Sequence, residues 1–361
     1  MKEKEKQLFK SLCKFKDKLP DNDLIQFATP SVLGHLFCNR MQGVAYGVLK
    51  KNGLISKINR EFRNAISAAY YQNVQKNISF KKCVAMISQS MSLCNFKFAM
   101  LKGAYLCMHY PNGYRTSNDL DILTLPENVT QIGKLLTSLG FRQGSIQNNK
   151  FVPATREQII VSKMMRGETV PYIKEVKLPF MRFFEVDINF SLDYKNGNED
   201  ILSNMLSRVC IKKEKGVSIP TLCNSDFFIH LCAHLYKEAT TFPWLEMRRD
   251  MTLYKYCDIY LLLSEMDNKT IQKIFERATE LGMNKICAYA ILEAIELFDI
   301  DNPFAYNISN SILRQDPTFR FLITSPKDKK TFIYQTHDAN KRFFMESRIN
   351  DLTEIFTNEK A

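Results

Sequence analysis

Two aspartates stand two residues apart within an apolar run of this chain, in the segment RTSNDLDIL. Successive side chains of a strand point to opposite faces, so Asp119 and Asp121 share one face while Leu120 and Ile122 enter the core. Two neighbouring carboxylates on a buried strand repel each other and are costly to desolvate. A divalent cation removes that penalty, and hard oxygen ligands are the ones that Mg²⁺ takes. The pair therefore predicts a strand that carries a cation site.

A third carboxylate follows on a later strand-like run, FFEVDINF, in which Asp187 lies between Val186 and Ile188. Glu185 shares a strand face with Asp187, so either acid could complete the ligand set. We favour Asp187, because it has apolar residues on both sides and lies nearer the middle of the run.

The residues around the aspartate pair are suited to phosphate. The run FKFAML predicts a strand before Lys102, and Gly103 then opens a predicted helix. Free N–H groups and the helix dipole at such a point can receive phosphate. Lys102 and Arg115 add positive charge on either side of the pair.

The order LKG, then R-x-x-x-D-h-D-h-L, then h-D-h-x-F (h, apolar) resembles the nucleotidyltransferase superfamily of the polymerase-β type. More narrowly, the chain resembles a poorly characterised bacterial group of nucleotidyltransferase family proteins, from about Val32 to about Leu292. Two positions depart from the pattern. Gly103-Ala104 stands where the superfamily usually has Gly-Ser or Gly-Gly, so a hydroxyl that would contact phosphate is missing. Asn189 stands where the narrower group often has His, which leaves the role of that position open.

The resemblance implies transfer of a nucleoside monophosphate from a nucleoside triphosphate (NTP) to an acceptor hydroxyl, with release of pyrophosphate. Asp119 and Asp121 would hold the Mg²⁺ or Mn²⁺ that bridges the triphosphate, and Asp187 would be a ligand of a second metal or the general base. ATP is the default substrate. The acceptor stays open between a small molecule, a peptide or protein, and RNA.

The same resemblance assigns Lys102, Gly103 and Arg115 to nucleotide binding. It also suggests that the helix carrying HLCAH faces the cleft, where His234 or Lys237 would approach the nucleotide or the acceptor. A helix-face histidine hydrogen-bonded to its surroundings is an equally good interpretation.

Three further features of the second half of the chain are candidates for a function. Asp258, in LYKYCDIYLLL, either points inward, orienting the acceptor or pairing with Lys255 or Arg249, or lies on the helix surface. Trp244 either stacks on a base or anchors packing. The HLCAH pair lacks the Glu that a zinc protease needs after its first His, so we predict no zinc.

Two functions from other classes fit parts of the pattern. A catalytically inactive nucleotide-binding or regulatory protein on the same fold is allowed by the missing Gly-Ser turn. A basic RNA-binding module whose acids are structural agrees with the charge of the chain, but no recognised RNA-binding motif supports it.

Composition sets outer bounds. The 361 residues include 50 basic and 38 acidic ones, giving a formal charge of +12 that favours anionic partners. The ten cysteines are scattered without C-x-x-C, which is typical of a reducing compartment. No run approaches the roughly eighteen apolar residues of a membrane helix, and no signal peptide is visible. We therefore expect a cytoplasmic protein without a membrane partner.

Hydrophobic periodicity predicts an α+β protein, with a small mixed β-sheet core flanked by N-terminal and C-terminal helical parts. We expect an N-terminal helical region over 1–95, a nucleotidyltransferase core over 96–220, a C-terminal helical domain over 221–300 and an accessory tail over 301–361. Within the core, 141–191 is expected to be mostly strands and loops, with an exposed hairpin near NNKFVPATREQ. The tail is expected to be less regular and partly helical.

Overall fold

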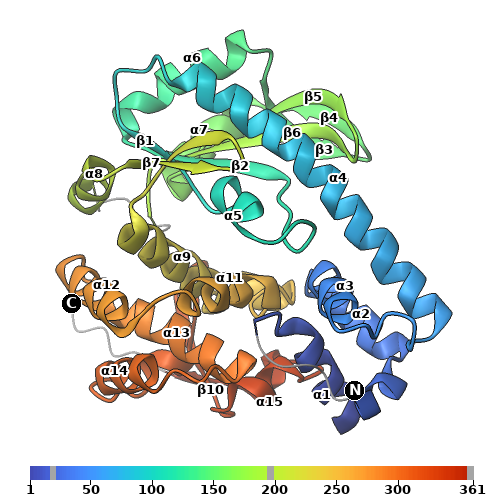
Figure 1. Cartoon of the computed structure of the whole chain (residues 1–361). Helices are drawn as coiled ribbons and strands as arrows, with labels where there is room; N and C mark the ends of the chain where they lie inside the picture. The colour runs from blue at the N-terminus through green and yellow to red at the C-terminus, as the bar shows by residue number, and fades with distance from the viewer. Residues whose placement is uncertain (17–21, 193–198, 356–361) are drawn as a thin grey trace. The chain divides into compact units, whose positions relative to one another are not determined.

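The structure, a computed structural model, describes residues 1–16, 22–192 and 199–355 (Figure 1). Contacts divide the chain into two compact units, one made of Met1–Ile66 with Phe228–Ala361 and the other of Ser67–Phe227. Among the described residues, no helix has both the length and the apolar character needed to span a bilayer.

The unit Ser67–Phe227 is built on a six-stranded mixed sheet with the strand order β1-β2-β6-β5-β3-β4. The strands are β1 (Phe98–Met100), β2 (Asp119–Thr124), β3 (Arg142–Gln147), β4 (Lys150–Pro153), β5 (Tyr172–Leu178) and β6 (Met181–Asn189). β2 and β6 run parallel, and the other neighbours pair antiparallel. The predicted α+β class with a small mixed sheet is confirmed.

One face of this sheet forms the core of the unit. Leu120 and Ile122 of β2 and Ile188 of β6 are fully buried together with side chains of α4 (Arg60–Met91) and α6 (Val129–Ser138). Figure 1 shows α4 and α6 running along the sheet. Because strand side chains alternate, the aspartates must project from the opposite face. We call that opposite face the site face.

The segment 141–191 contains more helix than expected. The predicted hairpin is present in part: β3 and β4 pair antiparallel around Asn148 and Asn149, but the end of the predicted segment is helical. The next residues form α7 (Arg156–Arg166), a helix in a segment where mostly strands and loops were predicted. Thr155 and Gln158 make a capping box at its start, and Gly167 ends it with a left-handed φ of 66°. This Thr-x-x-Gln pattern is a helix-start signal that the periodicity analysis missed.

The remaining elements of this unit lie between the strands of the sheet or after them in the sequence. They are α5 (Gly103–His109), η2 (Pro126–Asn128), α8 (Glu199–Ser207) and a separate hairpin of β7 (Cys210–Glu214) and β8 (Val217–Thr221). Thr221 at the end of β8 donates its hydroxyl to the carbonyl of Met100 at 2.6 Å, which ties the hairpin to β1.

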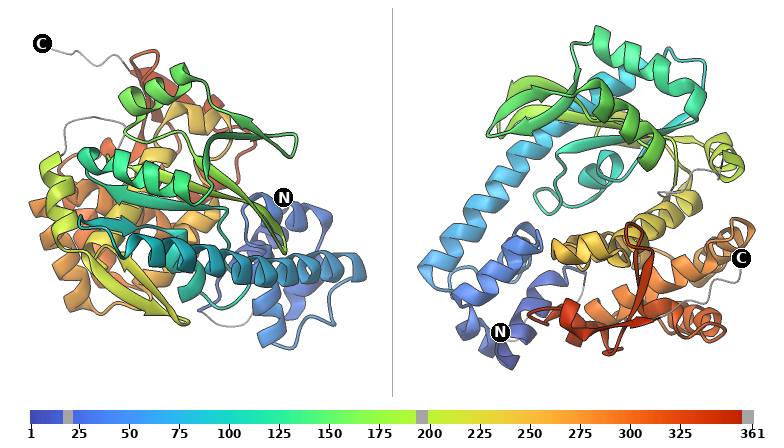
Figure 2. Two further views of the ribbon diagram at one scale, coloured as in Figure 1. Left: turned by 90° about the horizontal axis from the view of Figure 1, so that it is seen from above. Right: turned by 180° about the vertical axis from the view of Figure 1, so that it is seen from behind.

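The other unit is mainly helical (Figure 2). Its elements are α1 (Glu3–Cys13), η1 (Asn22–Phe27), α2 (Pro30–Cys38), α3 (Gln42–Lys51), α9 (Asn224–Ala239), which begins in the sheet unit, α10 (Phe242–Glu246), α11 (Leu253–Leu263), α12 (Asn268–Glu280), α13 (Asn284–Phe298), α14 (Pro303–Leu313), η3 (Phe319–Phe321), α15 (Ala339–Phe343) and η4 (Ile349–Asp351). The tail also contains a three-stranded sheet of β9 (Leu322–Ser325), β10 (Lys330–Tyr334) and β11 (Leu352–Ile355). These strands were not predicted in the tail, which was expected to be less regular and partly helical, because strands of four or five residues carry too little periodicity to detect.

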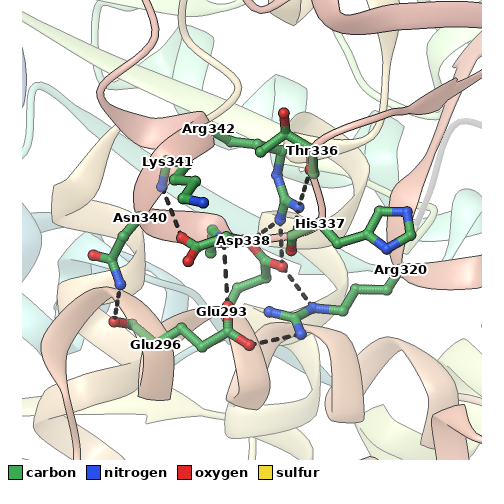
Figure 3. Close-up of polar contacts among 10 residues, drawn as sticks. Glu293, Glu296, Arg320, Thr336, His337, Asp338, Asn340, Lys341 and Arg342 are labelled. Carbon is green, nitrogen blue, oxygen red and sulfur yellow. Dashed lines mark hydrogen bonds and ion pairs between the residues drawn. The ribbon is translucent and has the colours of Figure 1, made fainter.

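A buried ionic cluster fastens the tail to α13 (Figure 3). Arg342 of α15 donates to both carboxylate oxygens of Glu293, at 2.7 and 2.8 Å. Arg320 donates to the same carboxylate at 2.8 Å and lies 2.7 Å from Glu296. Glu293 is completely buried, so its charge depends on these two arginines.

Candidate active site

The register of β2 and β6 brings the predicted acids together. Asp121 is the direct Cα partner of Asp187, and Asp119 is the partner of Glu185. Neighbouring strands lie about 4.8 Å apart, and directly paired residues project to the same side. All four carboxylates therefore belong to the site face.

Lys102 supplies a positive charge at this cluster. Its Nζ donates to Oδ1 of Asp121 at 3.0 Å, and the amide of Asn189 donates to the same oxygen at 3.4 Å. Burial acts to lower the pKa of Lys102, but the negative charges of Asp121, Asp119 and Asp187 outweigh it and raise that pKa. Lys102 therefore stays protonated, and Asn189, whose role was open, holds Asp121 from the other side.

The turn before α5 is conformationally restricted. Lys102 has φ 45° and ψ −111°, a backbone region that non-glycine residues rarely adopt. Gly103 is required for another reason, because a Cβ built there would lie 2.4 Å from Oγ of Ser117. Ser117 in turn donates to Oδ1 of Asp119 at 2.9 Å. The turn is thus packed directly against the loop that leads into β2.

Gly103→Ala is expected to destabilise the protein by about 1–3 kcal/mol, since an added methyl group must push the Ser117 loop away. Urea unfolding measures the change. Gly34→Ala in α2 is the matched control, because nothing lies within 4 Å of a Cβ built at Gly34. Adding Ser117→Gly to Gly103→Ala should recover part of the loss. Equal stability of Gly103→Ala and the natural protein would contradict the close packing.

The acids of the cluster disfavour one another's charge. The pKa of Asp187 is raised well above its usual value by burial first, then by the charges of Asp121, Asp119 and Glu168. The pKa of Glu185 is raised by burial and by Asp119. Asp187 thus feels both aspartates of β2, whereas Asp119 is the only acid among the causes for Glu185.

Glu168 is an acidic residue of this site that sequence reasoning missed. It forms an isolated β-bridge with Asn189, and the amide of Thr169 donates to the carbonyl of Ile188 at 2.9 Å. The chain reaches this place because Gly167 turns it directly after α7. No spacing in the sequence relates Glu168 to Asp187, so the α7 capping pattern and Gly167 were the only usable signals.

The donor set fits a divalent cation in chemical type, since the carboxylates of Asp119, Asp121 and Asp187 are hard oxygen ligands on one face. Within residues 1–16, 22–192 and 199–355, no three or more His, Cys, Asp or Glu side chains form a ready metal-binding group. The ammonium group of Lys102 neutralises Asp121 in the structure, and a cation bound there would compete with it.

Arg115, the other predicted phosphate contact, lies in the loop between α5 and β2 and is 8% exposed. Its Nη1 donates to the carbonyl of Thr116, and its own carbonyl accepts from the amide of Asn77 at 2.8 Å. Its role toward a nucleotide stays a prediction.

The three predicted cleft residues belong to the other compact unit, so their relation to the carboxylates stays a prediction. Nε2 of His234 lies 3.5 Å from Oε1 of Glu238 in the same helix. Asp258 is 4% exposed, which rules out the helix-surface interpretation. Lys255 forms an ion pair with Glu238.

Trp244 is half-buried, and Nζ of Lys255 lies 5.1 Å from the centre of its indole ring. This cation–π contact agrees with the packing interpretation of Trp244.

A known protein family matches most of the chain. The model of a protein family described as "Uncharacterised nucleotidyltransferase" matches residues 33–299. A solved structure, that of an antigenic nucleotidyltransferase-like protein from Paracoccidioides brasiliensis, is 15% identical with a TM-score of 0.30, over 48% of this chain and 73% of that one. No curated protein matches. The chain belongs to the family of uncharacterised nucleotidyltransferases.

Proposed function

We propose that this protein is an active nucleotidyltransferase, which moves a nucleoside monophosphate from an NTP to an acceptor hydroxyl. The observation that carries the proposal is the direct pairing of Asp121 with Asp187 on adjacent parallel strands. The raised pKa of Asp187 adds support, because it arises in part from the negative charges of neighbouring carboxylates. Strongly perturbed carboxyl groups are typical of functional sites.

In the proposed reaction the acceptor oxygen attacks the α-phosphorus, the bond from that phosphorus to the bridging oxygen of the β-phosphate breaks, and pyrophosphate leaves. Asp187 takes the proton of the acceptor hydroxyl, and its raised pKa suits it to that task. Lys102 donates to the negatively charged triphosphate. Asp119 and Asp121 would hold the Mg²⁺ or Mn²⁺, which when bound neutralises phosphate charge and makes the acceptor hydroxyl more acidic.

Ser117 offers the hydroxyl that the residue after Gly103 lacks. The superfamily pattern usually has Gly-Ser or Gly-Gly at the phosphate-binding turn, where this chain has Gly103-Ala104. Oγ of Ser117 lies close enough to Gly103 to occupy the space of a Cβ there. We infer that a hydroxyl on the neighbouring loop replaces the one missing from the turn, which weakens the argument for an inactive protein.

NTP binding is expected to require Mg²⁺ or Mn²⁺. Calorimetric titration of ATP, GTP, CTP and UTP with either metal should show binding that weakens at least about tenfold in EDTA. Asp121→Asn should show a similar loss with metal present, and Glu127→Gln, an exposed acid just beyond β2, should not. Equal affinity with and without metal would contradict the proposal.

An inactive nucleotide-binding protein predicts the same binding without chemistry. Incubation with labelled NTP, Mg²⁺ and a cell extract separates the two functions. Pyrophosphate release and a labelled acceptor are expected of a transferase, and the labelled molecule identifies the acceptor. Binding without release in every extract fraction would favour the inactive protein.

A further inference from the structure

A cationic pocket opens between β3, β4, β5 and β6. Its volume is ≈ 190 Å³, and none of the predicted catalytic acids lines it. Its charged lining residues are Arg142, Lys150, Lys174, Arg182 and Glu175. Four cations against one carboxylate leave three positive charges at this place. An anionic ligand is the chemistry that such a lining selects.

Part of this pocket lies on the site face. Arg142 is the Cα partner of Ile173, and Ile173 is the partner of Glu185, so all three project to the same side of the sheet. Phe183 precedes Glu185 by two residues on β6 and shares its face. Arg142, Ile173 and Phe183 all line the pocket. The pocket and the carboxylates are therefore accessible to one molecule lying along the sheet.

Both arginines are stacked on aromatic rings. The guanidinium carbon of Arg142 lies 4.3 Å from the ring centre of Phe151, and that of Arg182 lies 5.0 Å from that of Phe183. Stacking orients a guanidinium plane and leaves its N–H edges available for an oxyanion. Nε of Arg182 donates to Glu175 at 3.0 Å. In the described part of the chain, the side chain of Arg142 has a ring contact but no hydrogen bond or ion pair.

The span from the carboxylates to Arg142 limits what can bridge them. Arg142 lies two strands across from β6 and two residues along from Asp187, which corresponds to about 12 Å between backbone positions. A phosphate on the acceptor's own sugar is too near its hydroxyl to cover this span. The phosphate of a preceding nucleotide in a strand is farther away and fits better.

We propose that this pocket binds a phosphate group of the acceptor, with the acceptor hydroxyl at Asp187. The inference rests on the proposed function and deepens it, because it makes the acceptor a phosphorylated molecule. The shared chemistry is the phosphate, and a single-stranded polynucleotide is the source that the span favours over a phosphorylated small molecule.

The test measures phosphate binding in the absence of NTP. A labelled single-stranded RNA of about ten nucleotides is titrated by fluorescence anisotropy over a range of salt, and AMP and inorganic phosphate are used as competitors. Arg142→Gln/Arg182→Gln should weaken RNA binding at least about tenfold and reduce the salt slope by about one or two. Arg156→Gln on α7, which removes an exposed arginine outside the pocket, should leave both unchanged.

The competitors separate the two sources. RNA binding much tighter than that of AMP supports a polynucleotide acceptor, and AMP binding as tight as RNA supports a small phosphorylated one. If the double variant and the natural protein bind RNA, AMP and inorganic phosphate with equal affinity, the proposal that this pocket binds phosphate is wrong. Both arginines are exposed, so the unfolding midpoint should not change.

A failure of the proposed function gives a different result. Binding of Mg²⁺–ATP to the double variant should stay within about twofold of the natural protein, because the pocket is separate from the carboxylates. If the natural protein binds RNA through the pocket but binds no Mg²⁺–NTP, the proposed transfer fails and the acceptor assignment falls with it. If it binds Mg²⁺–NTP but the double variant binds RNA normally, only the pocket assignment fails.

Discussion

Asp187→Asn is expected to abolish nucleotidyl transfer while making the folded protein more stable. Asn is nearly isosteric with Asp but neither accepts a proton nor neutralises a cation, so the loss of rate should reach about 10³-fold. The stability gain follows from the same site. Asp187 is pushed toward its neutral form by burial and by Asp121, Asp119 and Glu168, so a neutral side chain relieves repulsion. The unfolding midpoint of the variant should therefore lie above that of the natural protein.

Three other variants, compared with Asp187→Asn, distinguish the roles of the acids. Asp187→Asn should leave the affinity for NTP within about tenfold of the natural protein, roughly 1.4 kcal/mol. The reason is that Asp187 lies on β6, whereas Asp119 and Asp121 lie on β2, which follows the phosphate-binding turn. Asp121→Asn should damage binding and turnover together. Near-normal transfer by Asp187→Asn with an inactive Glu185→Gln would show that Glu185 is the third acid. Full activity of Asp187→Asn, Glu185→Gln and Asp119→Asn would place the chemistry elsewhere.

The pH dependence of stability gives an independent check on Asp187. Its folded-state pKa is raised above the usual 3.8, so between these two values the folded protein holds more protons than the unfolded chain. Unfolding free energy should therefore fall as the pH rises from about 3.8 through the raised pKa. Asp187→Asn should remove this part of the slope. Urea titrations at successive pH values measure it, and parallel curves for both proteins would contradict the assignment.

The sequence predicted the site face better than the surroundings of the site. The alternation of Asp119, Leu120 and Asp121 is a local property of a strand, and the structure has the acids and the apolar residues on opposite faces as expected. The choice of Asp187 as a partner of Asp121 depended on an assumed pairing of two strands far apart in the chain. The observed register agrees with that pairing, but the role of each acid stays a prediction.

Features that depend on contacts distant in sequence were not predicted. The second half of α4 contributes Phe80 and Val84 to the core of the sheet, although its pattern is that of any amphipathic helix. Leu253 donates its amide to Asn39 at 3.0 Å, a contact 214 residues apart that joins the start of α11 to α2. Neither residue carries a local signal of its partner. Periodicity reports which side of an element is buried, and not what covers it.

Two charged groups show the same limit. Lys102 was predicted to contact phosphate, and its φ of 45° could not be foreseen, because glycine is the residue expected at positive φ. Glu293 lies in a mostly apolar helical segment, AILEAIELF, and from the sequence a charged residue there is expected at the helix surface. Only the return of the chain at Arg320 and Arg342 explains its burial.

Glu293→Ala is expected to cost about 3–5 kcal/mol of unfolding free energy, the largest stability effect that we predict. The variant leaves the guanidinium group of Arg342 in a site from which water is excluded, and it removes one of the two carboxylates that pair with Arg320. Burial acts to raise the pKa of Glu293, but Arg342 and Arg320 outweigh it and hold the pKa below its usual 4.5. The stabilisation is thus fully present above pH 4.5 and is lost as the pH falls through the lowered pKa.

Urea unfolding at neutral pH measures the effect of Glu293→Ala. Glu280→Ala on α12 is the matched control. The carboxylate of Glu280 pairs with Arg277 at 3.0 Å, but the Glu280 side chain is 63% exposed. Exposed ion pairs contribute only about 0–1 kcal/mol. Glu293→Leu combined with Arg342→Met should recover much of the loss, since it replaces the buried pair with apolar side chains and leaves Arg320 paired with Glu296. A loss from Glu293→Ala no larger than that from Glu280→Ala would mean that the tail is held to α13 by its apolar contacts rather than by this carboxylate.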